Sequence, residues 1–402
     1  MRESMSDRLD QRTDADLARE ASALTRRDFL LRACLCAGGA GLAALGWPRV
    51  ARSLSGSPWS EEEQARLGIR EASWYDKLDG LRVACKLCPR ECVVDDFERG
   101  YCGVRENRGG TYYTLVYGRP CSLHADPVEK KPLYHFLPGS KAFSLATAGC
   151  NMECQFCQNW QISQTRPEDL DSVELPPAQL AGSAVRSSCP IMAFTYSEPV
   201  IFYEYMRDAA AEGRKRGIRS VMISNGYIQP EPLRELAGVL DGIKVDLKAF
   251  QEGFYRDVCD GTLEPVLKTL EVLSEVGIWY EIVYLIVPTL NDDLAEIGRM
   301  SSWIRSRLGP HVPLHFSRFH PTYKIQNLPS TPIKTLEKAR TAALEAGLQF
   351  VYLGNVMGHE GESTYCPSCG RRVIHRFGYH VAENLLRSGR CPCGEALAGV
   401  WS

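Results

Sequence analysis

Short apolar runs and longer amphipathic runs alternate from residue 142 to residue 353. Short apolar runs are typical of buried strands, and amphipathic runs of ten or so residues are typical of helices. The predicted strands are residues 142–148, 190–196, 220–224, 243–247, 279–287, 314–316 and 350–353. The predicted helices are residues 199–217, 231–239, 263–276, 292–308 and 333–346, and three of them reach a glycine where a helix can end.

Strands that alternate with helices of this length predict βαβ units, and therefore a parallel sheet covered by helices. We expect an α/β fold with a partial or full (β/α) barrel of six or seven units, and small Cys-rich modules before and after it. In such barrels the loops after the strands carry the function. Polar groups follow five predicted strands, at Ser197-Glu198-Pro199, Asn225-Gly226-Tyr227, Asp246-Leu247-Lys248, residues 288–292 and His320-Pro321. We expect these groups on one rim of the barrel.

The first strand of the predicted barrel leads into a cysteine trio, Cys150, Cys154 and Cys157, with no histidine among them. Thiolates favour soft metal centres, above all iron–sulfur clusters. If a helix begins after Cys154, then Cys154 and Cys157 share one helix face and Cys150 reaches across from the preceding loop. Three ligands leave one iron of a four-iron cluster open, whereas structural zinc sites are closed by four ligands. The spacing alone leaves open a disulfide with a spare thiol, a zinc site with a borrowed ligand, or inert buried cysteines.

Composition narrows the class of protein. The chain has 402 residues, 44% of them hydrophobic, which is enough for one large core with smaller attachments. The 47 Lys and Arg residues do not outnumber the 49 Asp and Glu residues, so we expect no nucleic-acid partner. No segment is long and apolar enough to predict a stable transmembrane span. Small molecules or proteins are the expected partners.

The sixteen cysteines gather at metal-binding spacings, which argues against a disulfide scaffold. Besides the trio there are an N-terminal quartet, Cys85, Cys88, Cys92 and Cys102, and a C-terminal quartet, Cys366, Cys369, Cys391 and Cys393. The N-terminal quartet fits a closed zinc site or an auxiliary iron–sulfur cluster equally well. The C-terminal quartet resembles a zinc ribbon, although its second pair is separated by one residue where two are usual. We expect that tail to be a folding staple or contact surface.

The remaining segments complete the domain organisation. Arg26-Arg27 ahead of a modestly apolar run resembles a twin-arginine signal, which exports folded proteins across the bacterial inner membrane; an ordinary amphipathic helix on a cytoplasmic protein is the alternative. We expect a signal and linker over residues 1–58, a Cys-rich module over 59–138, the core over 139–356 and the zinc-ribbon-like module over 357–402. Within the second module, the polar residues of 112–138 either face a substrate or cover the core: His124, Asp126, Glu129, Lys130, Lys131 and His135.

The C-x3-C-x2-C spacing of the trio, with Phe156 before the third cysteine, resembles the radical S-adenosylmethionine (SAM) enzymes. Three segments extend the resemblance, namely residues 85–105, Asp126-Pro-Val-Glu-Lys-Lys-Pro-Leu-Tyr-His-Phe-Leu-Pro-Gly139 and Ala148-Gly-Cys-Asn-Met-Glu-Cys-Gln-Phe-Cys-Gln-Asn-Trp160. Together with the C-terminal knuckles they resemble the AmmeMemoRadiSam system radical SAM enzymes, which are similar to the activating enzymes of pyruvate formate-lyase. The resemblance covers about residues 80 to 402.

This resemblance implies a barrel of the radical SAM type in which the trio binds a [4Fe–4S] cluster and SAM chelates the open iron. One electron then cleaves SAM to a 5′-deoxyadenosyl radical, which takes hydrogen from the substrate. The implied SAM-binding residues are Phe156 at the adenine, Glu198 at the methionine ammonium, Asn225 at the ribose and methionine, Lys248 at the methionine carboxylate with Asp246 close by, and His320 after the sixth strand. Asn225 could instead form only a turn, and Asp246 with Lys248 only an ion pair.

Two classes of function follow. The first is a radical SAM enzyme that acts on a peptide, a protein or another substrate and takes electrons from a donor such as flavodoxin or ferredoxin. Its sharper variant is the activation of a glycyl-radical enzyme. The second is an exported iron–sulfur protein without turnover, which the signal supports because SAM and low-potential electrons are cytoplasmic.

Overall fold

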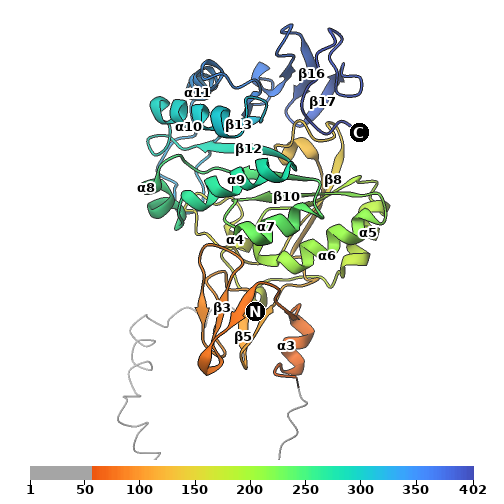
Figure 1. Ribbon diagram of the computed structural model, residues 1–402, viewed down its shortest axis with the longest axis vertical. Helices are drawn as coiled ribbons and strands as arrows, with labels where there is room; N and C mark the ends of the chain where they lie inside the picture. Colours follow the sequence, from red (N-terminus) through yellow and green to blue (C-terminus); the bar gives the residue numbers. More distant parts are fainter. Residues whose placement is uncertain (1–56) are drawn as a thin grey trace, which may run out of the picture. The chain divides into compact units, whose positions relative to one another are not determined.

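The centre of the protein is an eight-stranded sheet, which the computed structural model arranges in the order β14-β13-β12-β11-β10-β9-β8-β7 (Figure 1). The strands are β7 (Ser122–Pro127), β8 (Lys141–Ala146), β9 (Ile191–Phe194), β10 (Arg219–Ser224), β11 (Gly242–Asp246), β12 (Trp279–Ile286), β13 (Leu314–Arg318) and β14 (Val351–Gly354). Neighbouring strands from β8 to β14 are all parallel, and β7 is antiparallel to β8. Within residues 57–402, β7 and β14 remain the two edges, so the sheet is a partial barrel. The predicted α/β fold class is confirmed.

The structure describes residues 57–402, which form one compact unit. The predicted twin-arginine segment lies outside the described residues, so export stays a prediction. The predicted boundaries at residues 58, 138 and 356 also stay predictions, since the modules on either side of the core pack onto it within that one unit.

Helices connect the parallel strands. They are α4 (Trp160–Ser163), α5 (Pro177–Arg186), α6 (Tyr203–Arg214), α7 (Pro230–Ala237), α8 (Glu252–Phe254), α9 (Glu264–Val276), α10 (Leu294–Arg307) and α11 (Ile333–Glu345). Short 3-10 helices or turns of π-helix are η1 (Asp79–Leu81), η2 (Val128–Lys130), η3 (Pro167–Asp169), η4 (Pro199–Phe202), η5 (Tyr255–Cys259) and η6 (Glu360–Glu362). The seven predicted strands correspond to β8–β14, and the five predicted helices to α6, α7, α9, α10 and α11, with η4 forming the start of the first.

Helices α4, α5 and α8 and strand β7 escaped prediction. Helix α5 and strand β7 each have a weak local pattern. Helix α5 is rich in small residues and buries only Leu180, Ala181 and Ala184, so its apolar stripe is narrow. Strand β7 is an edge strand that is partly exposed and carries Asp126 and Pro127, which single-strand patterns do not favour. By contrast all four residues of β9 are buried, as expected for a strand covered on both faces.

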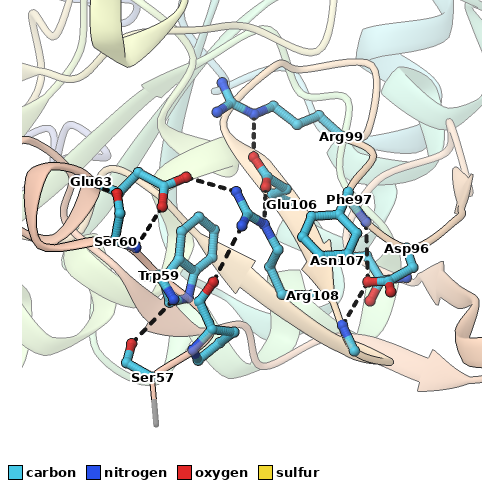
Figure 2. A network of polar contacts seen from close by, with 12 residues as sticks. Ser57, Trp59, Ser60, Glu63, Asp96, Phe97, Arg99, Glu106, Asn107 and Arg108 are labelled. Atoms are coloured by element: carbon cyan, nitrogen blue, oxygen red, sulfur yellow. Dashed lines mark hydrogen bonds and ion pairs between the residues drawn. The ribbon is translucent and has the colours of Figure 1, made fainter. Parts of the chain in front are cut away.

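Two three-stranded antiparallel sheets build the N-terminal module. Its elements are α3 (Glu61–Arg66), β1 (Arg70–Glu71), β2 (Tyr75–Lys77), β3 (Val83–Cys85), β4 (Val93–Val94), β5 (Arg105–Arg108) and β6 (Thr111–Thr114). Glu106 of β5 pairs with Arg99 at 2.6 Å and with Arg108, and Arg108 reaches Glu63 of α3 at 2.8 Å (Figure 2). This network joins α3 to the sheet of β1, β6 and β5.

The segment between β7 and β8 ties the C-terminal module, β15 (Thr364–Tyr365), β16 (Arg372–Phe377) and β17 (His380–Asn384), to the core. The Val400 N–H donates to the His135 carbonyl at 2.7 Å, and buried Arg376 donates to the Tyr134 carbonyl at 2.7 Å. Glu281 of β12 accepts from the backbone N–H groups of Tyr134, at 3.0 Å, and His135, at 2.8 Å. Residues 126–139 therefore mainly connect the C-terminal module to the sheet, and we call this segment the 126–139 brace.

Candidate active site

A cavity of about 450 Å³ lies at the carboxyl ends of the parallel strands. Eight residues predicted from the sequence line it: Cys150, Cys154, Phe156, Cys157, Glu198, Asn225, Asp246 and Lys248. They follow β8, β9, β10 and β11, so the rim expected from the strand order is where these side chains meet.

The cysteine loop after β8 differs from its prediction. No helix begins after Cys154; the segment is a turn in which the Cys157 N–H donates to the Cys154 carbonyl at 3.1 Å, and α4 begins only at Trp160. The reason is that the Gln155 carbonyl, which would accept an i→i+4 bond in such a helix, instead accepts from the N–H groups of Lys324 at 2.9 Å and Ile325 at 3.2 Å. The expected shared helix face of Cys154 and Cys157 was therefore wrong, although both still line the cavity.

The surroundings of the three sulfurs suit an iron–sulfur cluster. The Met152 N–H donates to Cys150 Sγ at 3.4 Å, and Cys157 Sγ lies 3.3 Å from Ser163 Oγ. The Cys259 side chain hydrogen-bonds to Cys154 and lowers the pKa of the Cys154 thiol, against the effect of burial. Within residues 57–402 the trio is not among the groups whose ligand atoms all lie within 4.8 Å of one another, so its arrangement is wider than that of a single-ion site. Three thiolates would ligate three irons of a four-iron cluster and leave one iron open.

Glu198 and Asn225 connect the loops after β9 and β10. The buried Glu198 carboxylate accepts hydrogen bonds from the Asn225 N–H at 2.8 Å, the Ser224 hydroxyl at 2.7 Å and the Val200 N–H at 3.1 Å. Burial raises the pKa of Glu198 to about 7, although these three donors act in the opposite direction. Asn225 Nδ2 donates to Asn151 Oδ1 at 2.8 Å, so this side chain also reaches the cysteine loop.

Asn225 also forms a turn, which was the alternative role considered for it from the sequence. Its Oδ1 accepts from the Tyr227 N–H at 2.9 Å, and Gly226 between them has a φ of 73°, a left-handed conformation that favours glycine. Asn225 therefore shapes the turn with one end of its amide and faces Asn151 beside the trio with the other.

Asp246 lies between two lysines at the end of β11. Lys248 Nζ is 3.0 Å from Asp246 Oδ2, and Lys244 Nζ contacts Oδ1. Burial would raise the pKa of Asp246, but the two ammonium groups outweigh it and lower this pKa to about 2. Lys244 lines the cavity and was missed; the available signal was a lysine inside a strand that is otherwise apolar. The ion pair left open for Asp246 and Lys248 exists, and it is part of the cavity wall.

Further residues of the cavity wall come from segments outside the parallel strands. Lys131 Nζ is 2.8 Å from Asp126 Oδ2 and donates to the Tyr196 hydroxyl at 3.2 Å, and burial lowers the pKa of Lys131 to about 8. Lys130 lines the cavity beside it, and Tyr379 of the C-terminal module does so from the turn between β16 and β17. Of the polar residues in 112–138, the two lysines thus face the cavity.

The other polar residues of that strip do not line this cavity. The His124 ring packs edge-on against Tyr196, with centroids 5.7 Å apart. Glu129 is fully buried next to Arg376, at 3.6 Å, and His135 is buried between Tyr352 and the Ala398 carbonyl. Glu129 and His135 belong to the brace, so for them the core-covering interpretation applies, whereas His124 of β7 is exposed.

The structure does not bring His320 to the cavity. Its side chain is exposed, and its Nδ1 lies 2.9 Å from Ser330 Oγ. After β13 the chain turns so that Phe319 is buried and its N–H bonds to Thr331 Oγ1 at 3.0 Å, which leaves His320 facing outward. Ser317 and Asn355 occupy the cavity wall in this region instead.

The two quartets are arranged differently. The C-terminal quartet is a group of potential ligands whose sulfur atoms all lie within 4.8 Å of one another, with Cys366 Sγ and Cys393 Sγ 3.7 Å apart. The N-terminal quartet lines a separate small cavity with Asn151 and does not meet that criterion. The C-terminal quartet is therefore a site that could bind a single metal ion.

Comparison with known proteins identifies the class. Residues 144–300 match the family model described as the radical SAM superfamily. A protein from Methanocaldococcus jannaschii is 47% identical over 332 residues, which cover 82% of this chain and 99% of that protein. The chain therefore belongs to the radical SAM superfamily, for which a [4Fe–4S] cluster and SAM are implied. That relative is the uncharacterized protein MJ0808.

More distant relatives include two activating enzymes. The benzylsuccinate synthase activating enzyme of Thauera aromatica is 23% identical, with 40% of this chain and 53% of that enzyme covered. The pyruvate formate-lyase 1-activating enzyme of Escherichia coli K12 is 23% identical, with 39% of this chain and 65% of that enzyme covered. A crystallised domain of the pyruvate-formate lyase-activating enzyme from Bacteroides vulgatus has a TM-score of 0.37 at 18% identity, covering 40% of this chain and 98% of that domain. No helix within residues 57–402 has the length and apolarity needed to cross a bilayer.

Proposed function

We propose that this protein is a radical SAM enzyme that cleaves SAM reductively and removes a hydrogen atom from a peptide, a protein or another substrate. One observation carries this proposal: the three cysteines and five of the six residues expected to bind SAM, all except His320, line a single cavity of about 450 Å³ at the ends of four different strands. A cavity of this size is in the range that small-molecule cofactors occupy.

Different residues of the cavity would bind the cluster and SAM. The trio would hold the [4Fe–4S] cluster, which when bound supplies the electron that cleaves the sulfonium of SAM. Glu198 Oε1 already accepts two hydrogen bonds, from Val200 and Ser224, whereas Oε2 accepts one from Asn225, so Oε2 has capacity for the methionine ammonium. Because the Glu198 carboxylate is held by three donors, it is oriented before SAM arrives.

Lys248 supports the other end of the methionine moiety. Its ammonium group is held by Asp246 at 3.0 Å, and it lies 6.0 Å from the centre of the Phe156 ring. It would donate to the methionine carboxylate, while Phe156, which packs against Phe254, gives the adenine an apolar surface. The wall with Lys130, Lys131 and Tyr379 is left for the substrate.

The test is SAM cleavage by protein reconstituted anaerobically with iron and sulfide. With dithionite and SAM it should release 5′-deoxyadenosine, and Cys154→Ala should abolish this release. Cys189→Ala, a buried cysteine outside all three groups, is the matched control and should leave the rate unchanged. A fully loaded trio that yields no 5′-deoxyadenosine would refute the enzyme and support a non-catalytic iron–sulfur protein.

A second candidate is activation of a glycyl-radical enzyme. The observation that favours it is the similarity to two activating enzymes. Membership of the radical SAM superfamily does not by itself indicate this activity. Incubation of the active protein with purified pyruvate formate-lyase and SAM should then produce the electron paramagnetic resonance (EPR) signal of a glycyl radical. An enzyme that releases 5′-deoxyadenosine without that signal, but shifts the mass of another partner protein, would contradict this candidate.

We also propose, on the segments at 85–105, 126–139 and 148–160, membership of the AmmeMemoRadiSam group, and export by the twin-arginine route on Arg26-Arg27. The export proposal is tested with residues 1–58 fused to a reporter. Export that is unaffected when both arginines are replaced by lysine would contradict it.

A further inference from the structure

The N-terminal quartet encloses a cavity of its own beside the trio. Cys85 ends β3, Cys88 and Cys92 follow in the loop to β4, and Cys102 lies before β5. All four cysteines line one small cavity, together with the buried side chains of Arg105 and Tyr112. Cysteines from four points of one module thus converge, as ligands of a bound centre do.

The sulfurs of this quartet are not gathered as closely as those of the C-terminal quartet. Four thiolates at about 2.3 Å from a zinc ion lie about 3.8 Å apart. The C-terminal quartet has this spacing, at 3.7 Å in each of two pairs. Within residues 57–402 it alone brings three or more potential ligand atoms within 4.8 Å of one another; the N-terminal quartet and the trio do not. Sulfurs around a four-iron cluster stand farther apart than around one ion, because a cube of iron and sulfide lies between them.

A backbone hydrogen bond also reaches one sulfur of the N-terminal quartet. The Tyr101 N–H donates to Cys92 Sγ at 3.4 Å. Such bonds stabilise the negative charge on ligating sulfur and set the reduction potential of a cluster.

The quartet is packed directly against the loop of the trio. Asn151, the neighbour of Cys150, lines the quartet's cavity, and Arg90 Nε donates to the Asn151 carbonyl at 3.1 Å. A Cβ atom on Gly149 would lie 2.7 Å from the Cys102 carbonyl oxygen, so the two loops touch through their backbones. Cys102 and Cys150 together line a further cavity of about 750 Å³. The two cysteine groups are therefore adjacent, with Arg90 and Asn151 between them.

We propose that Cys85, Cys88, Cys92 and Cys102 hold an auxiliary [4Fe–4S] cluster rather than zinc, and that this cluster relays electrons to the centre held by the trio. The relay rests on the proposed radical SAM function, whereas the cluster itself does not. A one-electron carrier of the flavin or iron–sulfur class reduces the auxiliary cluster by one electron. That electron passes to the centre at the trio and leaves the auxiliary cluster oxidised again, with no bond made or broken in the transfer.

The cluster is tested without the trio, in the full chain with Cys150→Ala, Cys154→Ala and Cys157→Ala. After anaerobic reconstitution this variant should retain about four iron and four sulfide per chain and show a cluster EPR signal on reduction with dithionite. Adding Cys85→Ala and Cys88→Ala should remove the bound iron and sulfide and the EPR signal. Adding Cys189→Ala instead should leave them in place. Zinc bound at the quartet, with no iron retained, would overturn the proposal, and this outcome is independent of whether the enzyme cleaves SAM.

The relay is tested with reduced flavodoxin as the donor and freeze-quench EPR of the trio's centre as the readout. Arg90→Met keeps all eleven grouped cysteines and should slow reduction by flavodoxin roughly tenfold or more, while the iron content stays that of the wild type. Cys88→Ser, which breaks the quartet, should slow it further, and reduction by the small molecule dithionite should be affected less in both. If flavodoxin reduced the trio's centre at equal rates in the wild type and both variants, the relay would be refuted. The proposal of an auxiliary cluster would not be affected.

Discussion

Cys366 Sγ lies 3.7 Å from Cys393 Sγ, although only one residue separates Cys393 from the preceding cysteine. The same distance separates Cys369 Sγ from Cys391 Sγ. Both values match the edge of a zinc–thiolate tetrahedron, about 3.8 Å. The shortened knuckle therefore still brings both of its sulfurs to the site, and a further N–H bond, from Cys393 to Cys391 Sγ at 3.5 Å, supports it.

We predict one zinc ion at the C-terminal quartet and a structural role for it. Cys393→Ser should lower the zinc content by about one ion per chain and lower the melting temperature, because metal binding is coupled to the folding of such small modules. Zinc analysis and thermal unfolding are the measurements. Cys189→Ala is the control, since that cysteine is buried but ungrouped; a Cys393→Ser variant that keeps the wild-type zinc content would contradict the assignment.

Glu198→Gln should weaken SAM binding. The substitution keeps the shape of the side chain but removes the charge that would face the methionine ammonium, and hydrogen bonds to charged groups contribute about 1.5–3 kcal/mol. The dissociation constant should therefore rise by about 10- to 100-fold. Calorimetric titration of the reconstituted protein with SAM measures it. Glu212→Gln, on the surface of α6 and paired with Lys215, should have no effect; equal affinities for Glu198→Gln and wild type would exclude this contact.

His135 should make folding stability fall in acid. Its ring lies between the Ala398 carbonyl at 2.7 Å and the Tyr352 hydroxyl at 2.6 Å, and burial lowers its pKa from 6.5 to about 4. Between these two values the unfolded chain binds a proton that the folded chain does not, so the stability contributed by neutral His135 is lost as the pH falls from about 6.5 to 4. At pH 5 this loss amounts to about 2 kcal/mol.

Urea unfolding at pH 7.5 and pH 5.0 measures this dependence. His135→Gln should be less stable than wild type at pH 7.5 but should lose about 2 kcal/mol less between the two pH values. The exposed His311 supplies the control, because His311→Gln should follow the wild type. If His135→Gln and wild type lost equal stability, His135 would not be the titrating group.

Single substitutions in the buried ion pair of Arg105 and Glu204 should be strongly destabilising. Both side chains are 1% exposed, and the guanidinium contacts the two carboxylate oxygens at 3.1 and 2.6 Å. Arg105→Met or Glu204→Gln leaves a buried charge without its partner, which should cost about 3–5 kcal/mol of unfolding free energy. The double variant should cost less than the sum of the two, as a double-mutant cycle would measure. Arg256→Met removes an exposed pair with Asp257 and should leave the stability nearly unchanged. Additive costs at Arg105 and Glu204 would contradict the coupling.

The sequence by itself determined the barrel strands and most of the rim. Apolar runs such as the four residues of β9 are buried on both faces, and that burial is a local property of the sequence. Parallel strands then place their carboxyl ends on one side, so Glu198, Asn225, Asp246 and Lys248 could be brought together from their positions after strands. The radical SAM class followed from the spacing of the trio, and the comparisons confirmed it.

Only the tertiary structure decided features that depend on contacts between distant segments. The cysteine loop is a turn because the Gln155 carbonyl accepts from N–H groups more than a hundred residues away, at Lys324 and Ile325. Tyr379 enters the cavity wall because the 126–139 brace holds the C-terminal module against the core, and His320 leaves it because the chain turns after β13. The sulfur spacing that separates a single-ion site from a cluster site has the same origin. Cysteines at similar sequence spacings can enclose an ion or a larger group, and the packing of the whole module sets the distance between them.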